Sequence, residues 1–221
     1  MLTVHHLNNS RSQRVLWLLE ELGVPYEVLR YQRLPDMRAA PELRAIHPLG
    51  KSPVITDNGS TIAESGAIIE YLIDTYGQGR LIPLPNTPAR LRYTYWLHYA
   101  EGSAMPPLLL KLLFTVMPKR APALLRPIVR KVSTQVLTAL VNPQLKQHMA
   151  FWEAELSKTQ WFAGDEFTAA DIQMSFPLEA AAARAGLDQG HPKAMAFLDR
   201  IHARPAYQRA LEKGGPYTVG R

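Results

Sequence analysis

Hydrophobic positions in the first third of the chain alternate between strand spacing and helix spacing. Residues 2–7 and 26–31 are short apolar runs that favour strands, and a helical pattern that ends near Gly23 lies between them. A further short helix, weakened by Pro41, is expected over residues 36–46. The apolar positions of the first helix are Val15, Leu18, Leu19 and Leu22.

Two more strands and another helix follow. Residues 54–56 and 61–63 flank Asn58 and Gly59, a dipeptide that favours a tight antiparallel hairpin. The strands and helices together predict a compact mixed sheet with helices, in the order strand, helix, strand, helix, strand, strand, helix. The apolar positions of the last of these helices, which ends near Gly77, are Ile68, Ile69, Leu72, Ile73 and Tyr76.

The pattern changes after this helix. Glycine and proline cluster between residues 77 and 88, where Thr87 and Pro88 are typical of a helix cap and first turn. Beyond them strand signals nearly vanish, which predicts a helical domain whose long helices are kinked or divided by prolines. We therefore expect an α/β domain over residues 1–80, a linker over residues 81–87 and an all-α domain over residues 88–221.

Composition excludes several classes of protein. The 221 residues include no cysteine, which rules out structural disulfides, cysteine metal sites and an internal Cys-x-x-Cys redox centre. No apolar run is long enough to span a bilayer, and the first residues lack the pattern of a secretory signal. We expect a cytoplasmic protein without stable membrane insertion.

The net charge of +6 is concentrated in the middle of the chain, because residues 80–150 contain 10 Lys and Arg but a single acidic residue, Glu101. Such a segment can attract nucleic acid, anionic lipid or an anionic substrate, or it can be a solvated helix face. No nucleic-acid motif accompanies the charge, so a nucleic-acid partner is not expected. The histidines show no metal-ligand spacing and there is no glycine-rich phosphate loop, so no metal is expected either.

A turn and a helix start lie close together between residues 50 and 66. Pro53 follows Gly50, Lys51 and Ser52 where a strand should begin, which alone is compatible with an edge strand. Ser65 follows Glu64 at the start of the next helix, where its hydroxyl can act as a cap. A helix N-terminus also offers free N–H groups and a positive dipole end, which suit a carboxylate.

This pattern resembles the thiol-peptide cradle of the soluble, cytosolic glutathione transferases, in particular their bacterial and fungal serine-type members. The resemblance covers almost the whole chain and implies a thioredoxin-like glutathione-binding domain followed by a helical bundle. It implies a cis bond before Pro53, with the Ser52 backbone pairing with the cysteinyl part of glutathione like an added strand. It also implies that Ser65 holds the γ-glutamyl carboxylate, that Glu64 receives the α-ammonium group and that Lys51 contacts the peptide.

The catalytic prediction rests on residues 8–14, just after the first strand. A hydroxyl or amide donor near a helix N-terminus can stabilise the glutathione thiolate, which is the nucleophile. Serine-type members have a serine four residues before an arginine, and Ser10 and Arg14 match that spacing. Asn9 is the second candidate, and the other loop residues rank lower. Ser10 with Gln13 also fits a capping box, which would be purely structural.

Two segments of the helical domain carry further predictions. Four apolar side chains are either lining of a co-substrate pocket or plain core: Trp96, Tyr99, Met105 and Phe114. Thr168 and Asp171 fit a capping box, flanked by a possible hydrophobic staple between Phe167 and Ile172. The family has such a box in its helical domain, and we interpret it as a folding element.

The resemblance implies a detoxification enzyme that transfers the glutathione sulfur to a hydrophobic electrophile. Glutathione is then a co-substrate, no resident cofactor is needed, and the protein is expected to be a homodimer. Glutathione-dependent peroxide reduction is a further activity of the same site. The alternative is a non-catalytic glutathione-binding or protein-interaction module of the same fold. A thiol–disulfide oxidoreductase that uses its own thiol is excluded, because the chain has no cysteine.

Overall fold

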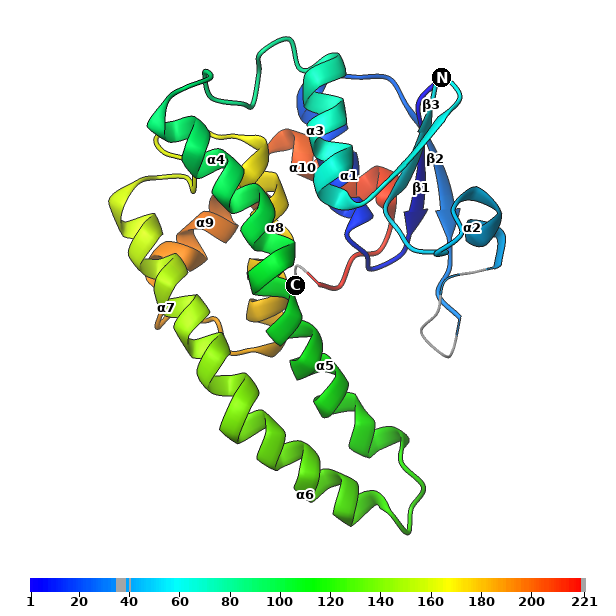
Figure 1. Ribbon diagram of the computed structural model, residues 1–221, viewed down its shortest axis with the longest axis vertical. Helices are drawn as coiled ribbons and strands as arrows, with labels where there is room; N and C mark the ends of the chain where they lie inside the picture. Colours follow the sequence, from blue (N-terminus) through cyan, green and yellow to red (C-terminus); the bar gives the residue numbers. More distant parts are fainter. Residues whose placement is uncertain (35–38, 40, 220–221) are drawn as a thin grey trace.

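The computed structural model describes residues 1–34, 39 and 41–219, which form a sheet-based N-terminal domain and a helical C-terminal domain (Figure 1). This arrangement confirms the predicted fold class of a thioredoxin-like domain followed by an all-helical domain. The last N-terminal helix ends at Tyr76 and the next begins at Pro88, so the expected linker of residues 81–87 lies between them. The domain boundaries themselves stay a prediction.

The sheet has the strand order β2-β1-β3-β4. Strand β1 pairs in parallel with β2 and antiparallel with β3, and β3 pairs antiparallel with β4, so the sheet is mixed as predicted. Asn58 and Gly59 both have positive φ angles, 47° and 83°, which is what the tight β3–β4 turn requires. The strands are β1 (Thr3–Leu7), β2 (Glu27–Tyr31), β3 (Val54–Asp57) and β4 (Ser60–Ala63).

Helices cover both sides of the sheet. Helices α1 (Ser12–Leu22) and α3 (Ser65–Tyr76) lie on the side that faces the helical domain, and α2 (Pro41–Ile46) lies on the other (Figure 1). Helix α1 ends as predicted at Gly23, whose left-handed φ of 66° lets its N–H bond the Leu19 carbonyl. The expected helix over residues 36–46 begins only at Pro41, and residues 35–38 and 40 lie outside the described part of the chain.

The described part of the second domain consists of helices joined by loops. It contains α4 (Pro88–Tyr99), α5 (Met105–Arg120), α6 (Arg126–Val136), α7 (Asn142–Lys158), α8 (Ala169–Arg184), α9 (Pro192–His202) and α10 (Pro205–Gly214). Two π-helical segments join neighbouring helices: η1 (Ala100–Ala104) and η2 (Leu137–Val141). In the part of the chain that the structure describes, no helix is long and apolar enough to cross a membrane.

Prolines shape these helices mainly at their first turns. Pro88 opens α4 behind Thr87, whose hydroxyl accepts the Arg90 N–H at 3.2 Å, as the cap signal predicted. Pro106 and Pro143 lie just after η1 and η2, so the chain changes its hydrogen-bonding pattern where proline withdraws an N–H group. The helices are therefore divided, as expected, by π-helical segments beside Pro106 and Pro143 and by the α5–α6 loop, which contains Pro122.

Helix α8 lies at the centre of the helical domain and begins at the predicted capping box. The carboxylate of Asp171 accepts the N–H of Thr168 at 2.8 Å and the N–H of Phe162 at 2.9 Å. Asp171 is fully buried. Its carboxylate thus joins the start of α8 to the preceding loop, which supports the interpretation as a folding element.

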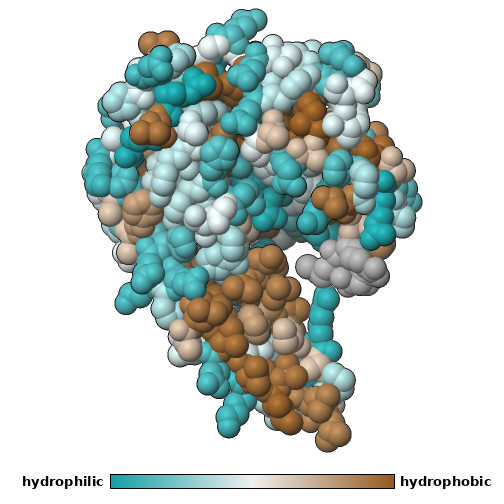
Figure 2. Space-filling view, viewed as in Figure 1, coloured by the Kyte–Doolittle hydropathy of each residue, from teal (hydrophilic) through white to brown (hydrophobic). Residues whose placement is uncertain are grey.

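The α5–α6 hairpin extends well beyond the rest of the molecule (Figure 1). Large apolar side chains are exposed along it, and Figure 2 shows them as one continuous hydrophobic face. The side chains of this face, which we call the hairpin face, are Leu109, Leu113, Met117, Leu125, Ile128 and Val132.

Candidate functional site

Ser10 lies in the loop between β1 and α1, where the start of the helix brings several hydroxyl groups together. Its hydroxyl oxygen is 3.3 Å from the Oγ of Ser52 and 2.7 Å from the Oγ of Ser12. Its side chain is largely buried, with an exposed fraction of 4%. The structure therefore brings the predicted thiol partner next to the residue predicted to hold the cysteinyl part of glutathione.

Ser52 joins the loop before β3 to the end of β1. Its hydroxyl donates to the His5 carbonyl at 3.1 Å and accepts the Leu7 N–H at 3.3 Å. The Ser52–Pro53 peptide bond is cis, as the resemblance implied. The side chain of Ser52 thus has a structural role, because it joins this loop to β1. This role is separate from the predicted contact between the Ser52 backbone and a peptide.

Ser65 is the first residue of α3 and lies beside a buried arginine. The Nη2 atom of Arg14 donates to the Ser65 hydroxyl at 3.0 Å and to Glu101 at 2.5 Å, while Nη1 donates to the Gln173 carbonyl at 2.7 Å. The Arg14 side chain is only 1% exposed. Ser65 does not cap the helix, since Glu64 occupies the N-cap position and makes no side-chain cap bond.

The charges around Arg14 are balanced by one carboxylate. Burial by itself would raise the pKa of Glu101, but the Arg14 and Arg11 guanidinium groups outweigh it and hold that pKa below its ordinary value. Arg11 pairs with Glu101 at 2.9 Å. Burial lowers the pKa of Arg14, while the neighbouring Glu101 acts in the opposite direction. Glu101 is therefore ionised and keeps both arginines in place beside Ser65 and Ser10.

Lys51 and Glu64 are the exposed members of the predicted set. Glu64 has a φ of 72°, in the left-handed region, immediately before Ser65. Lys51 lines a cavity of about 320 Å³ together with Ser52 and Arg11. Arg33 and Arg44 also line this cavity, so its wall is strongly basic and suits an anionic ligand.

Asn9, the second candidate for the thiol partner, is held from another direction. Its φ is 51°, and its side-chain oxygen accepts the N–H of Thr218 at 2.8 Å and the Thr218 hydroxyl at 3.1 Å. The C-terminal segment thus returns to the β1–α1 loop and uses the Asn9 oxygen. The alternative capping box of Ser10 with Gln13 does not form, because the N-cap of α1 is Arg11 and no side-chain cap bond is made.

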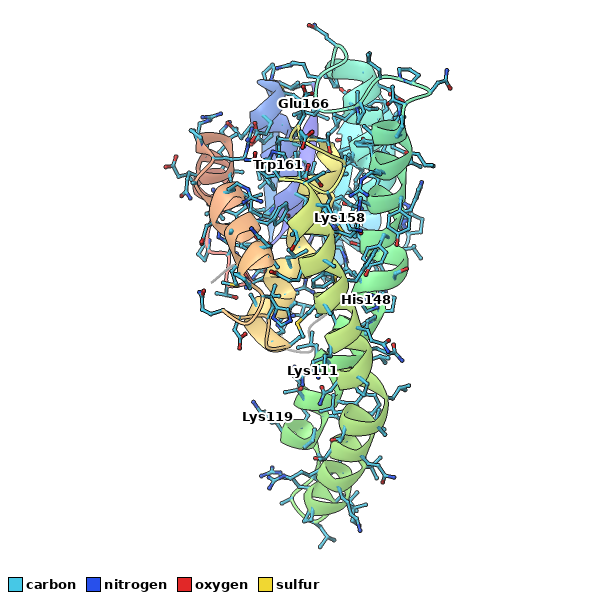
Figure 3. The ribbon with its side chains drawn as sticks, turned by 90° about the vertical axis from the view of Figure 1, so that its left-hand side faces the viewer. Lys111, Lys119, His148, Lys158, Trp161 and Glu166 are labelled. Atoms are coloured by element: carbon cyan, nitrogen blue, oxygen red, sulfur yellow. The ribbon has the colours of Figure 1, made fainter. Side chains whose placement is uncertain are left out.

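The four residues expected to line a co-substrate pocket lie in two places. Trp96 is 1% exposed and packs on Phe162 with ring centroids 4.5 Å apart. The buried Tyr99 hydroxyl bonds His148, which Figure 3 labels on α7, and accepts the Trp152 indole N–H at 3.2 Å.

Met105 and Phe114 belong to α5. Met105 is buried in the core at the first turn of the helix. Phe114 lines a separate cavity of about 430 Å³ between α5 and α6, with Lys119 and Arg130 in its wall. Figure 3 shows Lys119 on the side of the hairpin turned away from α3.

Several residues of the site were not singled out from the sequence. Glu101 had a usable signal, because it is the single acidic residue between positions 80 and 150. Gln173 contributes a backbone carbonyl, and His6 and Ser12 act through side-chain hydrogen bonds to one another and to Ser10. Ser12 was one of the lower-ranked candidates of its loop, and no pattern in the sequence distinguishes Gln173 or His6. Within residues 1–34, 39 and 41–219 there is no cluster of three or more His, Asp or Glu side chains that could hold a metal ion.

Comparison with known proteins agrees with this geometry. Residues 1–74 match the family model described as Glutathione S-transferase, N-terminal domain, and residues 116–205 match the one described as Glutathione S-transferase, C-terminal domain. Glutathione S-transferase 3 of Schizosaccharomyces pombe is 36% identical over 214 residues, covering 96% of this chain and 88% of the relative. Glutathione S-transferase 1 of Saccharomyces cerevisiae is 32% identical over 222 residues, covering 96% and 95%.

The fold agrees with solved structures as well. A crystal structure of a glutathione S-transferase from Actinobacillus pleuropneumoniae superposes with a TM-score of 0.80 at 33% identity, covering 100% of this chain and 96% of that one. The family models, the relatives and the arrangement of Ser10, Ser52 and Ser65 all agree. The chain belongs to the glutathione S-transferase family.

Proposed function

We propose that the protein is a glutathione transferase that adds the thiolate of glutathione to hydrophobic electrophiles, in a detoxification role. The observation that carries this proposal is the position of Ser10, whose hydroxyl lies 3.3 Å from Ser52 beside the basic cavity. A sulfur placed at this point would meet a hydroxyl near the start of α1, where donors favour a thiolate. Two curated relatives named glutathione S-transferase align with nearly the whole chain and support the same activity.

The tripeptide binds across the edge of the N-terminal domain in this proposal. The Ser52 backbone, before Pro53, pairs with its cysteinyl part, and the start of α3 at Ser65 receives its γ-glutamyl carboxylate. Glu64 takes the α-ammonium group, and Lys51 contacts the anionic peptide from the cavity wall. Ser10 is the thiol partner in this proposal, because its hydroxyl lies beside Ser52, whereas the Asn9 side chain is tied to the C-terminal segment through Thr218. Structures of relatives titled as complexes with glutathione support binding of this ligand to the fold.

The electrophile binds next to the sulfur, on the side of the helical domain. Glu101 and Arg11 mark this side, and Met105 begins α5 one turn after Glu101. Met is adaptable and suits a permissive apolar wall. Trp96 and Tyr99 are buried residues of α4 whose rings pack against α7, and they shape this wall through packing. Phe114 lies further along the hairpin.

The protein works as a cytoplasmic homodimer in this proposal. The cytoplasm is a reducing compartment in which glutathione is available, and the chain has no cysteine that would need an oxidising one. The hairpin face is a continuous apolar surface rather than a set of scattered side chains (Figure 2). Continuous surfaces of this kind mark contacts with other proteins. A two-fold dimer would cover the same face on both subunits.

Calorimetric titration with glutathione, followed by turnover assays, tests the proposed function. We expect saturable binding, and turnover with electrophiles such as activated aryl halides; an organic hydroperoxide in the same panel measures peroxide reduction. Absence of binding would contradict the proposal. Binding without turnover of any substrate would instead identify a non-catalytic glutathione-binding module.

A further inference from the structure

A chain of hydrogen bonds runs from Ser10 into the interior of the N-terminal domain. The Oγ of Ser10 lies 2.7 Å from the Oγ of Ser12, which lies 2.8 Å from the Nδ1 of His6. All three side chains are buried, with exposed fractions of 4%, 0% and 3%. The proposed reaction uses only the first of these groups, so Ser12 and His6 have no assigned task.

The direction of the hydroxyl protons depends on which ring nitrogen of His6 carries the hydrogen. The Gly214 backbone hydrogen-bonds the His6 ring and favours its protonated form, which identifies the Gly214 carbonyl as the acceptor. Because Nδ1 faces Ser12, the N–H that points to Gly214 belongs to Nε2. A neutral imidazole has a single N–H, so Nδ1 remains an acceptor for the Ser12 hydroxyl.

His6 is neutral at physiological pH. Burial and the nearby Arg30 guanidinium lower the pKa of His6 to about 4, although the hydrogen bond with Gly214 acts in the opposite direction. The Ser12 proton therefore points to Nδ1 at 2.8 Å, or to the Leu7 carbonyl at 3.4 Å, and in both cases away from Ser10. The Ser12 oxygen is then free to accept, and at 2.7 Å it is a nearer acceptor for the Ser10 hydroxyl than the Ser52 oxygen at 3.3 Å.

We propose that Ser12 and His6 are positioning residues that hold the Ser10 proton inward and thereby set the pKa of the bound glutathione thiol. This inference rests on the proposed function, because it takes Ser10 as the thiol partner. With its proton on Ser12, Ser10 presents a lone pair to the sulfur, and it also accepts the Ser12 N–H at 3.2 Å. To stabilise a thiolate, Ser10 must turn its proton outward and give up the 2.7 Å bond.

Ser12 is thus the nearest competitor of the glutathione sulfur for the Ser10 proton, and removing it has a characteristic effect on the thiol pKa. Ser12→Ala removes the shorter of the two Ser10 contacts and leaves only the 3.3 Å contact with Ser52, so the proton turns to the sulfur more readily. The thiol pKa then falls by about 0.5 to 1 unit, the worth of one hydrogen bond. His6→Phe acts in the same direction, because a Ser12 hydroxyl that is no longer drawn to Nδ1 can donate to Ser10. General loosening of the loop would instead raise the thiol pKa toward that of free glutathione.

The test is a pH titration of enzyme-bound glutathione, followed by the ultraviolet absorbance of the thiolate, in the parent, Ser12→Ala and His6→Phe. Ser157→Ala is the matched control, because the Ser157 hydroxyl lies on the exposed face of α7 and donates to the Glu153 carbonyl. We expect a lower thiol pKa in both variants, no change in the control, and the same shift in the pH profile of kcat/KM. An unchanged or higher thiol pKa in either folded variant overturns the inference.

A further variant separates this inference from the proposed function. If Ser10→Ala leaves the thiol pKa at the parent value, Ser10 is not the thiol partner and the inference falls with it. If Ser10→Ala raises the thiol pKa while Ser12→Ala does not lower it, the proposed role of Ser10 stands and only the inference fails. Circular dichroism of each variant confirms that the fold is retained, and either folded variant suffices for the decision.

Discussion

Ser10 has one hydroxyl proton, and two neighbouring hydroxyl oxygens lie within 3.3 Å of it. In a site of this kind the activity depends on which acceptor receives that proton, since a thiolate gains only from a donor that is free to turn toward it. The Ser65 hydroxyl also has a protein partner already, because its oxygen accepts a hydrogen bond from Arg14 at the start of α3. Single substitutions at these hydroxyls therefore separate thiol activation from peptide binding.

Ser10→Ala is expected to lower kcat about tenfold to a hundredfold, because one or two pKa units of thiolate stabilisation are lost. The affinity for glutathione should change much less, since the peptide is held elsewhere. Steady-state kinetics with one electrophile, together with calorimetric titration, measures both quantities. Ser10→Thr, which keeps a hydroxyl, is the control. If Asn9→Ala lowers kcat and Ser10→Ala does not, Asn9 is the thiol partner.

Ser65→Ala is expected to weaken glutathione binding about tenfold to a hundredfold, the worth of one hydrogen bond to a charged group. The loss should appear mainly in the dissociation constant, because the proposed partner of Ser65 is the γ-glutamyl carboxylate and not the sulfur. Ser60→Ala, an exposed serine of β4, is the matched control. If Ser65→Ala and the parent bind glutathione with equal affinity, the γ-glutamyl carboxylate does not bind at Ser65.

His6 is expected to make stability depend on pH between about 4 and 6.5. Its pKa is lowered to about 4 in the folded chain, mainly by burial, and has its ordinary value of 6.5 when unfolded. Between these values the unfolded chain binds more protons, so the free energy of unfolding falls as the pH falls, by up to about 3 kcal/mol. Above pH 6.5 this contribution is constant.

Urea unfolding of the parent and His6→Phe at several pH values checks this expectation. The stability of the parent relative to the variant should decrease on going from pH 6.5 to pH 4. A difference that does not change across this range would show that His6 titrates normally in the folded protein.

The start of α8 shows how one side chain stabilises an element. Asp171 accepts two backbone N–H groups, from Thr168 and Phe162, and also the Thr168 hydroxyl at 3.1 Å. A simple cap would satisfy donors of its own helix only, whereas this carboxylate also holds the loop that contains Phe162. Both donors are buried, so neither can turn to water when the carboxylate is removed.

Asp171→Ala is therefore expected to lower the free energy of unfolding by about 2–4 kcal/mol, more than the loss of an exposed helix cap. Urea unfolding followed by circular dichroism measures the change. Asp165→Ala, an exposed acidic residue of the preceding loop, serves as control and should leave the unfolding midpoint unaltered. A midpoint for Asp171→Ala that equals the control would contradict the role of the buried carboxylate.

On the face that Figure 2 shows, the most extended hydrophobic surface is the hairpin face, whose side chains project from the body of the protein into solvent. Basic residues lie elsewhere on the same hairpin, including Lys119 on the side turned away from α3 (Figure 3). The charge that residues 80–150 carry is therefore partly a property of this projecting hairpin. An apolar face separated from the cations fits a second copy of the chain better than a charged ligand.

If the hairpin face forms the proposed dimer contact, Leu113→Lys combined with Ile128→Lys is expected to yield monomers, because charged side chains would be buried there. Sedimentation at several protein concentrations measures the mass. Leu84→Lys introduces the same charge at an exposed leucine outside the hairpin and should leave the dimer intact. A parent protein that sediments as a monomer, or a double variant that remains dimeric, would exclude this interface.

Much of the fold was predictable because it depends on residue types and spacings within short segments of the chain. The 3.6-residue period of α1 and α3, the Asn58–Gly59 turn and the Thr87–Pro88 cap act on neighbours within a few residues. The π-helical form of the joints beside Pro106 and Pro143 was not predictable, because a proline is equally compatible with a kink, a break or a new first turn. The same division applies to the site, where Ser10, Ser52 and Ser65 had signals in turns and helix starts.

The sequence by itself determined the two-part fold, the turn before Pro53, the helix start at Ser65 and the absence of any protein thiol, since each follows from residue type and short-range spacing. Only the tertiary structure decided what surrounds the serine hydroxyls. Glu101 reaches Arg14 across 87 positions, and Thr218 reaches Asn9 across 209. Contacts of this kind leave no periodic trace, because their partners are joined by packing and not by the local geometry of the chain.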